Sequence, residues 1–173
     1  MAMLCTLDSM YKSLFMQNKS FTFIFGFTFI LFALLGCENK KGAFIKSYIS
    51  QNSHQKTLEK LIQTIKSQEL RLFYTIDHSA NAKDVNMTLK AKNVVIFGNP
   101  SMGTKLMKCN PSMGLDLPLR ILVSSNYEGI TRLSYTNPEY WSLKHNIKDK
   151  KCLNIITKAK MALADLVEKA GTK

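Results

Sequence analysis

The sequence predicts an α+β fold in which helices cover one face of an antiparallel sheet, giving a two-layer sandwich. Short segments rich in aromatic and β-branched residues indicate strands, and two longer segments repeat apolar residues at the spacing of a helix. From residue 44 to residue 173 the order of the main segments is strand, helix, four strands, helix. Successive strands joined by short connections favour antiparallel pairing.

The first elements are predicted from periodicity and from helix-capping residues. Residues 44–50 (FIKSYIS) and 70–77 (LRLFYTID) have the composition of strands. Between them Ser53 is a suitable N-cap for a helix over 54–68, whose apolar residues fall on one face. These are Leu58, Leu61, Ile62 and Ile65.

The later elements are predicted in the same way, after a polar stretch over 78–92 that has room for a short helical turn. Strands are expected over 93–98, 115–125 and 130–136, with Pro118 near the start of the second, as at an edge or bulge. Helices are expected over 102–109, 138–145 and 151–170. The long last helix has one apolar side, formed by Ile155, Ile156, Ala159, Leu163, Leu166 and Val167.

The first 36 residues are typical of an export signal. Lys12 and Lys19 give a weakly basic start, and residues 21–35 (FTFIFGFTFILFALL) carry no charge. This apolar segment is shorter than the roughly 20 residues that a transmembrane helix needs. The sequence therefore predicts an N-terminal apolar signal helix that is removed on export.

Residues 34–37 (LLGC) resemble the lipobox of bacterial lipoproteins, in which a small residue precedes the cysteine that receives lipid. The resemblance implies a signal peptide over 1–36, a tether over 37–43 that is lipidated at Cys37, and a folded domain over 44–173. The lipid would anchor the protein in a bacterial cell envelope, with the domain in the periplasm. Glu38, rather than an aspartate, favours the outer membrane over the inner one.

Two alternatives to this arrangement stay open. The apolar segment could remain as an uncleaved signal anchor, with Cys37 as a buried thiol. Translation could also start at Met10 or Met16 instead of Met1, which would leave Cys5 out of the protein.

The chain is strongly basic, with a formal net charge of +12. Without Lys12, Lys19 and Asp8 of the leader, residues 38–173 keep a net charge of +11. The lysines are scattered and lack the interleaved aromatic residues of single-strand binders, so no nucleic-acid partner is expected. An anionic membrane surface or cell-wall polymer fits an exported protein better, and the alternative is a solvated basic surface.

After removal of Cys5 and lipidation of Cys37, two cysteines remain, Cys109 and Cys152. In an oxidising compartment they could form one disulfide. The sequence alone does not show that they come close enough, so the free thiols stay as an alternative.

From about Leu70 onward the chain resembles the domain-of-unknown-function 302 family. Several motifs in the right order carry the resemblance: 76–78 (IDH), 95–100 (VIFGNP), 103–107 (GTKLM), 114–120 (GLDLPLR), 133–135 (LSY), 137–138 (NP) and 144–145 (KH). The resemblance implies a β-α-β4-α arrangement like that of the TATA-binding protein, which matches the predicted order. It implies no activity, and a shared fold implies nothing about DNA.

Polar residues of these motifs lie at predicted strand ends, where binding sites are usually built. They are His78, Asn99, Thr104, Asp116, Tyr135, Asn137 and His145. His78 could pair with Asp116 or His145 across the fold, as in acid–base or metal sites. The alternative is that the asparagines form turns and caps and the histidines bond backbone carbonyls. No set of nucleophile, base and orienting residue can be placed, so an enzyme is not the favoured expectation.

Met102, Cys109 and Met113 form an unusual sulfur-rich group. Thioethers and a thiolate suit Cu(I), which makes copper handling an alternative function. The competing interpretation is that methionines fill gaps in the core, and no cofactor or metal is expected.

We therefore expect an envelope-anchored binding or interaction module, partnered by the membrane through its lipid and by an unknown small ligand near His78 and His145. A homodimer is compatible with a sheet whose second face is uncovered. A small periplasmic enzyme that uses the two histidines is the alternative.

Overall fold

The structure is a computed structural model that describes residues 44–173. The predicted leader, the tether and Cys37 lie outside the described residues. Helices and strands follow in the order β1 (Ile45–Ile49), α3 (His54–Ser67), β2 (Arg71–Asp77), α4 (His78–Asp84), β3 (Lys92–Gly98), α5 (Pro100–Cys109), η1 (Pro111–Leu115), β4 (Leu119–Ser125), β5 (Thr131–Thr136), η2 (Pro138–Tyr140), α6 (Trp141–Lys144) and α7 (Lys150–Gly171).

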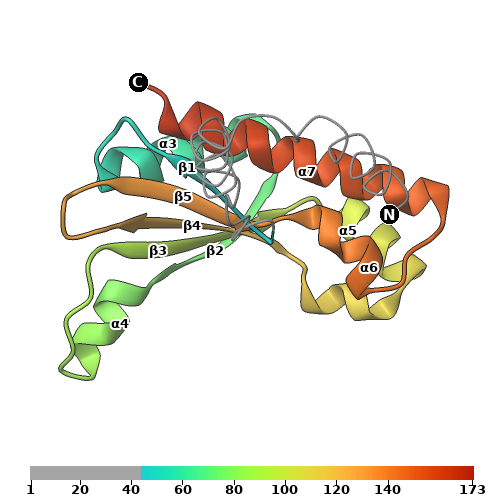
Figure 1. The fold of residues 1–173 in the computed structure, drawn as a ribbon, viewed down its shortest axis with the longest axis horizontal. Coiled ribbons are helices and arrows are strands. Elements are labelled where there is room, and N and C mark those ends of the chain that lie inside the picture. Colours follow the sequence, from blue (N-terminus) through green and yellow to red (C-terminus); the bar gives the residue numbers. More distant parts are fainter. Residues whose placement is uncertain (1–43) are drawn as a thin grey trace, which may run out of the picture. The chain divides into compact units, whose positions relative to one another are not determined.

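The strands form one five-stranded sheet in the order β1-β5-β4-β3-β2, with every neighbouring pair antiparallel (Figure 1). Apart from the short helices, the order of elements is β-α-β4-α. The predicted α+β class and the predicted order are therefore confirmed. Among the described residues, no helix combines the length and the apolar character needed to cross a membrane.

The main core lies between the sheet and the two longest helices, α3 and α7. Alternate residues of β3, β4 and β5 point towards these helices because successive side chains of a strand face opposite ways. The buried side chains include Leu61, Ile65, Val95, Phe97, Ile121, Val123, Leu133, Leu163 and Leu166.

The opposite face of the sheet carries half-buried and exposed apolar side chains. Val94, Ile96 and Leu122 are half-buried there, and Tyr74 lies beside Ile96 with 65% of its surface exposed. The homodimer expected through an uncovered face stays a prediction.

The ends of several elements are set by capping side chains, of which Ser53 was predicted. The Ser53 side chain accepts a hydrogen bond from the backbone N–H of Lys56 and begins α3. The predicted helix over 102–109 begins earlier, at Pro100, because Asn99 caps it and proline suits the first helical position. The polar stretch after β2 contains α4, whose cap is Asp77.

One predicted strand boundary was wrong. The strand expected over 115–125 begins at Leu119, because the preceding segment is a 3₁₀ helix, η1. Asn110 caps η1, Pro111 begins it, and Met113 anchors it with a fully buried side chain. Pro118 has no N–H to donate to a neighbouring strand, and pairing of β4 with β3 starts after it, at Leu119.

Candidate ligand-binding site

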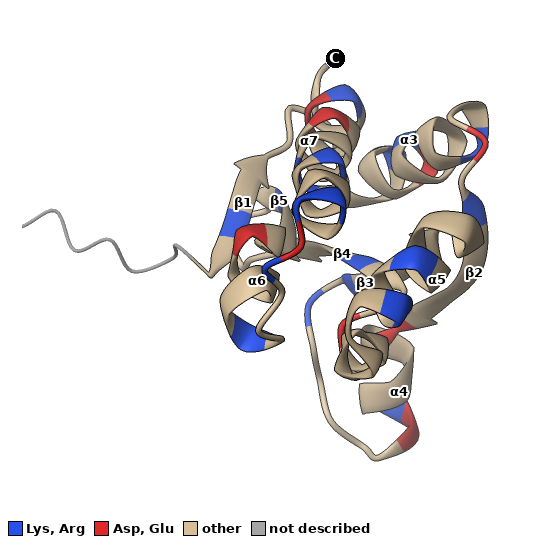
Figure 2. Ribbon diagram, turned by 90° about the vertical axis from the view of Figure 1, so that its right-hand side faces the viewer, with Lys and Arg blue, Asp and Glu red and all other residues tan. Residues whose placement is uncertain are grey.

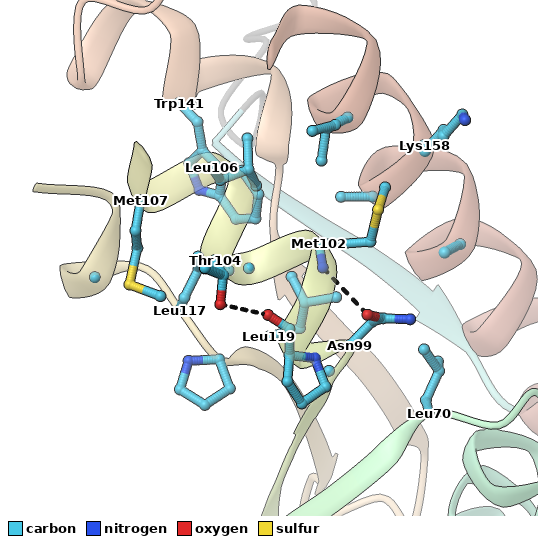
Figure 3. Close-up of a pocket in the computed structure, with 18 of the residues that line it drawn as sticks. Leu70, Asn99, Met102, Thr104, Leu106, Met107, Leu117, Leu119, Trp141 and Lys158 are labelled. Atoms are coloured by element: carbon cyan, nitrogen blue, oxygen red, sulfur yellow. Dashed lines mark hydrogen bonds between the residues drawn. The ribbon is translucent and has the colours of Figure 1, made fainter. Parts of the chain in front are cut away.

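A cavity of about 410 Å³ lies beside α5, where β2 begins and β3 ends. Its walls come from α5, from η1 and the segment after it, and from the facing side of α7. Figure 3 shows Met102 pointing from α5 towards α7 across this space. Most of the lining is apolar and includes Leu70, Phe73, Met102, Leu106, Met107, Leu117, Trp141, Ile155, Ala159 and Ala162.

Polar side chains in the lining are few, namely Asn99, Thr104 and Lys158. The first two already have partners in α5. Asn99 Oδ1 accepts from the Met102 N–H at 3.1 Å, and Thr104 Oγ1 donates to the Pro100 carbonyl at 2.8 Å. Lys158 is therefore the lining group whose charge is available to a ligand.

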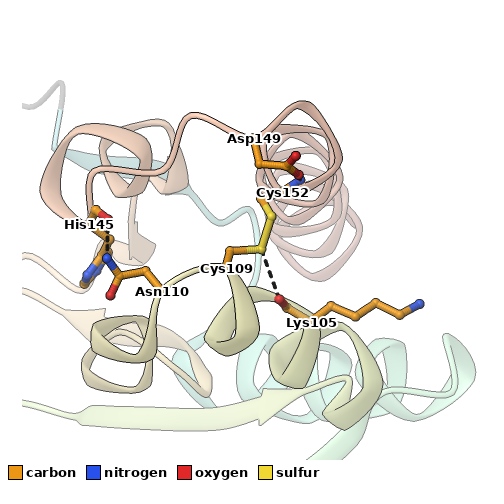
Figure 4. Close-up of a disulfide and its surroundings, with 6 residues drawn as sticks. All are labelled: Lys105, Cys109, Asn110, His145, Asp149 and Cys152. Carbon is orange, nitrogen blue, oxygen red and sulfur yellow. Dashed lines mark hydrogen bonds between the residues drawn. A yellow bond between two sulfur atoms is a disulfide. The ribbon is translucent and has the colours of Figure 1, made fainter.

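A disulfide fastens two walls of the cavity together. Cys109, the last residue of α5, is bonded to Cys152 in the first turn of α7 (Figure 4). Cys152 is buried in a second core cluster with Leu106, Met113 and Trp141. The cavity thus lies against a packed and cross-linked support, which limits the movement of its walls.

A polar network lies next to η1. His145 Nε2 is 2.6 Å from Asp116 Oδ2, and His145 Nδ1 is 2.7 Å from Ser112 Oγ. Lys144 donates to the other Asp116 oxygen at 2.9 Å. Burial raises the pKa of the Asp116 carboxyl group, but the hydrogen bonds and charges of His145 and Lys144 outweigh it, so this pKa lies below its usual range.

Ser112, His145 and Asp116 have the composition of a hydrolase triad, but their surroundings do not suit catalysis. In a triad the histidine must also deliver a proton to the leaving group. Only 2% of the His145 side chain is exposed, so a substrate cannot reach it. Ser112 Oγ also lies 2.8 Å from Asn110 Oδ1 and can donate its proton there instead. The network joins η1 to the end of α6.

The remaining predicted site residues lie apart from one another. His78 begins α4, at the opposite end of β2 from the cavity, and does not meet Asp116 or His145. Asn137 is the buried cap of η2. Tyr135 packs in the main core, and burial raises the pKa of its hydroxyl group. Of the seven residues, Asn99 and Thr104 line the cavity, and Asp116 and His145 form a bonded pair outside it.

Most cavity residues were missed by reasoning from the sequence. Four of them are apolar residues of helices, and their spacing is typical of side chains that pack in a hydrophobic core: Met102, Trp141, Ile155 and Ala162. One usable signal was the short helix over 100–109, which is rich in methionine and small residues and too short to bury a full apolar face.

The Cu(I) hypothesis requires a free thiolate at Cys109, which the structure does not provide. Cys109 is in the disulfide, Met113 is fully buried, and Met102 and Met107 belong to the cavity lining. Within residues 44–173, no cluster of three or more His, Cys, Asp or Glu side chains is arranged to hold a metal ion.

The fold and the cavity define a small α+β domain with an internal apolar site and a disulfide beside it. The chain belongs to the family described as "Domain of unknown function DUF302", whose model matches residues 46–170. A solved structure, an uncharacterized conserved DUF302 protein from Bacillus stearothermophilus, has a similar fold. It superposes with a TM-score of 0.67 at 15% identity, over 75% of this chain and 99% of that one.

Curated relatives are longer proteins. "Fluoride-specific ion channel FluC 1" of Brucella suis biovar 1 and the protein of the same name from Brucella abortus biovar 1 are each 34% identical over 98 residues. That match covers 57% of this chain, and 39% and 36% of the two relatives. The chain therefore corresponds to less than two fifths of each relative.

Proposed function

We propose that the described domain is a binding module for a small, mainly apolar ligand that enters the cavity between α5 and α7. The cavity itself carries this proposal. Its volume of about 410 Å³ falls within the roughly 300–1,000 Å³ of small-molecule sites. Its lining, apolar with a few polar groups, is also typical of such sites.

The cavity walls support binding without large rearrangement. Leu106 of α5 and Trp141 of α6 are nearly fully buried, which fixes one side of the site. The Cys109–Cys152 bond, which belongs to the same core cluster, holds α5 against α7. A preformed site loses less conformational entropy on binding, so these features favour a ligand site over a packing defect.

The proposal places this domain in a bacterial cell envelope, as a lipoprotein anchored through Cys37. Support comes from the sequence of the leader and from the position of β1, which begins at Ile45. A tether this short would keep the domain close to the membrane. The lipid, the periplasmic location and the preference for the outer membrane are parts of the proposal.

Binding can be tested with a neutral apolar dye, N-phenyl-1-naphthylamine, and residues 42–173. A protein made almost wholly of this fold exists as a solved structure, so the segment is expected to fold alone. Trp141 is the single tryptophan of the chain and lines the cavity, so its fluorescence reports occupancy. We expect saturable binding that quenches Trp141.

A matched pair of variants on α7 separates the cavity from the surface. Ala162→Phe fills the cavity, whereas Met161→Phe adds a ring at a neighbouring position that is 66% exposed. Ala162→Phe should weaken dye binding by about tenfold or more, because the new ring occupies space that the dye needs. Burial of an apolar group of this size contributes about 1.5 kcal/mol or more to the binding free energy, and the dye loses that contribution. Equal binding by both variants, or no saturable binding by the unmodified domain, would contradict the proposal. Thermal unfolding checks that both fold.

A further inference from the structure

We propose that the ligand is an anionic single-chain amphiphile, specifically a long-chain carboxylate, with its alkyl chain in the cavity and its carboxylate at the mouth. This inference rests on the proposed function and adds the chemistry of the ligand's polar end. It is carried by the distribution of charge around the cavity.

Lys158 is the one charged residue of the cavity lining. It lies on the exposed side of α7, and Figure 3 shows its side chain extending away from the apolar residues towards the edge of the site. Lysine commonly packs its alkyl stem on apolar surface while the ammonium group stays in water. Lys158 has no ion-pair partner within residues 44–173, so its charge is free to meet a ligand.

A second cation lies at the β2 side of the cavity. The Arg71 guanidinium stacks over Phe73, a lining residue, at 5.3 Å from the ring centroid. In the sheet, Arg71 of β2 lies opposite Gly98 of β3. Gly98 directly precedes Asn99, which caps the N-terminus of α5. The positive end of α5 therefore lies beside this arginine, although the helix end alone would not define a site.

Most acidic side chains near these cations already have partners, and the exception is the exposed Glu69 beside Leu70. Helix α5 contains lysine but no acidic residue, and α7 has none before Asp165 (Figure 2). Asp165 is held by Lys169 and by Gln68. Glu139 is paired with Lys160, and Asp116 with Lys144 and His145. The unpaired charges nearest the cavity are thus Lys158 and Arg71 against Glu69, which is positive overall and complements an anion.

The apolar remainder of the site explains why the anion should carry a long chain. Inorganic or small organic anions would leave the lining of leucine, methionine and phenylalanine side chains unfilled. An alkyl chain fills it, and each methylene that becomes buried raises affinity by about fourfold. A headgroup attached to such a chain stays at the mouth, where it can meet Lys158, which lines the cavity, or Arg71, whose guanidinium stacks on the lining residue Phe73.

The experiment compares dodecanoate, 1-dodecanol and dodecyltrimethylammonium, each below its micelle concentration, by dye displacement and Trp141 fluorescence on residues 42–173. We expect dodecanoate to bind about threefold to tenfold more tightly than the alcohol, and the cation to bind most weakly. Affinity should also rise from octanoate through decanoate to dodecanoate. Equal affinities for dodecanoate and the alcohol would overturn the inference but leave the proposed function standing. Failure of all three probes and of the dye would overturn both.

Variants locate the headgroup. Lys158→Met keeps an unbranched stem and removes the charge, so it should lose the preference for dodecanoate and still bind dodecanol. Arg71→Gln should act in the same direction. Lys83→Met is the matched control, since Lys83 is exposed on α4, at the opposite end of β2. A preference unchanged in both Lys158→Met and Arg71→Gln, or reduced equally in Lys83→Met, would overturn the placement of the carboxylate.

Discussion

At the scale of single residues, Asp116 is the most heavily bonded acidic side chain near the site. Its two oxygens accept from His145 and from Lys144, and 12% of the side chain is exposed. It follows η1 directly, whereas His145 follows α6. The carboxylate therefore connects two short elements that have little regular hydrogen bonding of their own.

We predict that Asp116→Asn destabilises the domain by about 1–3 kcal/mol, because it removes a charged acceptor from a nearly buried histidine. The pKa of Asp116 is lower in the folded than in the unfolded chain. Its contribution is therefore fully present above the unfolded value of about 3.9 and is lost as the pH falls through the folded value. Urea unfolding between about pH 5 and pH 2.5 should show a smaller loss of stability in the variant than in the unmodified domain.

Asp84→Asn serves as the control, because Asp84 is exposed at the end of α4. That change should alter unfolding at neutral pH by less than about 0.5 kcal/mol. If the two variants behaved alike, Asp116 would not hold η1 to α6 in the way described.

The sequence indicated Asp116 and His145 as polar motif residues, and the structure joins them. It gave no sign of Ser112, because a serine after a proline in a turn is unremarkable. The role of Lys158 could not be found either, since it is one of many scattered lysines and only the position of α7 makes it part of the cavity. Sequence patterns show residue types, whereas the site depends on which segments meet.

At the scale of elements, the cavity depends on how α5 and η1 are held. This segment leaves the sheet after β3 and returns at β4, so it is tied to the core only by side chains. Leu106 and Met113 pack into the second core cluster, and Cys109 is bonded to Cys152 of α7. Of these attachments, the disulfide is covalent, whereas Leu106 and Met113 are held by packing.

We predict that the Cys109→Ser/Cys152→Ser variant is less stable by about 2–4 kcal/mol, since the bond joins residues 43 apart and restricts the unfolded chain. The same variant should bind the dye more weakly, because α5 is then free to move away from α7. Chemical unfolding and dye titration measure the two effects. Addition of a reductant should lower the stability of the unmodified domain and leave that of the variant unchanged; a variant as stable as the parent would contradict the prediction.

The long helices and the strands were predictable because each has a strong local pattern. The apolar stripe and the Ser53 cap predicted α3, and the repeat from Ile155 to Val167 predicted α7. Residues 115–118 were misassigned to a strand, because Leu115 and Leu117 continue the apolar pattern of β4, whereas the 3₁₀ helix that Asn110 and Pro111 begin extends to Leu115. Capping by a side chain and burial of Met113 outweigh the local apolar pattern there.

At the scale of the whole molecule, the net charge and the proposed anchor at Cys37 support the proposal that the domain lies beside an anionic membrane. Residues 38–173 carry a net charge of +11, which would attract anionic lipid headgroups. Seven residues separate Cys37 from Ile45, the first residue of β1. An extended chain from Cys37 to Ile45 reaches about 29 Å at most. An anchor at Cys37 would therefore keep the domain close to the membrane surface.

The full chain, expressed in a bacterium, should be cleaved before Cys37 and carry a diacylglyceryl group on its thiol, because the apolar segment and the small residue before the cysteine match a lipoprotein signal. Mass spectrometry of the mature N-terminus and detergent partitioning measure both changes. Cys37→Ser should block lipidation, whereas Cys5→Ser, within the leader, should not. An unmodified Cys37 in the mature protein would overturn the anchoring proposal while leaving the binding cavity untouched, because every residue that lines the cavity lies between Leu70 and Ala162.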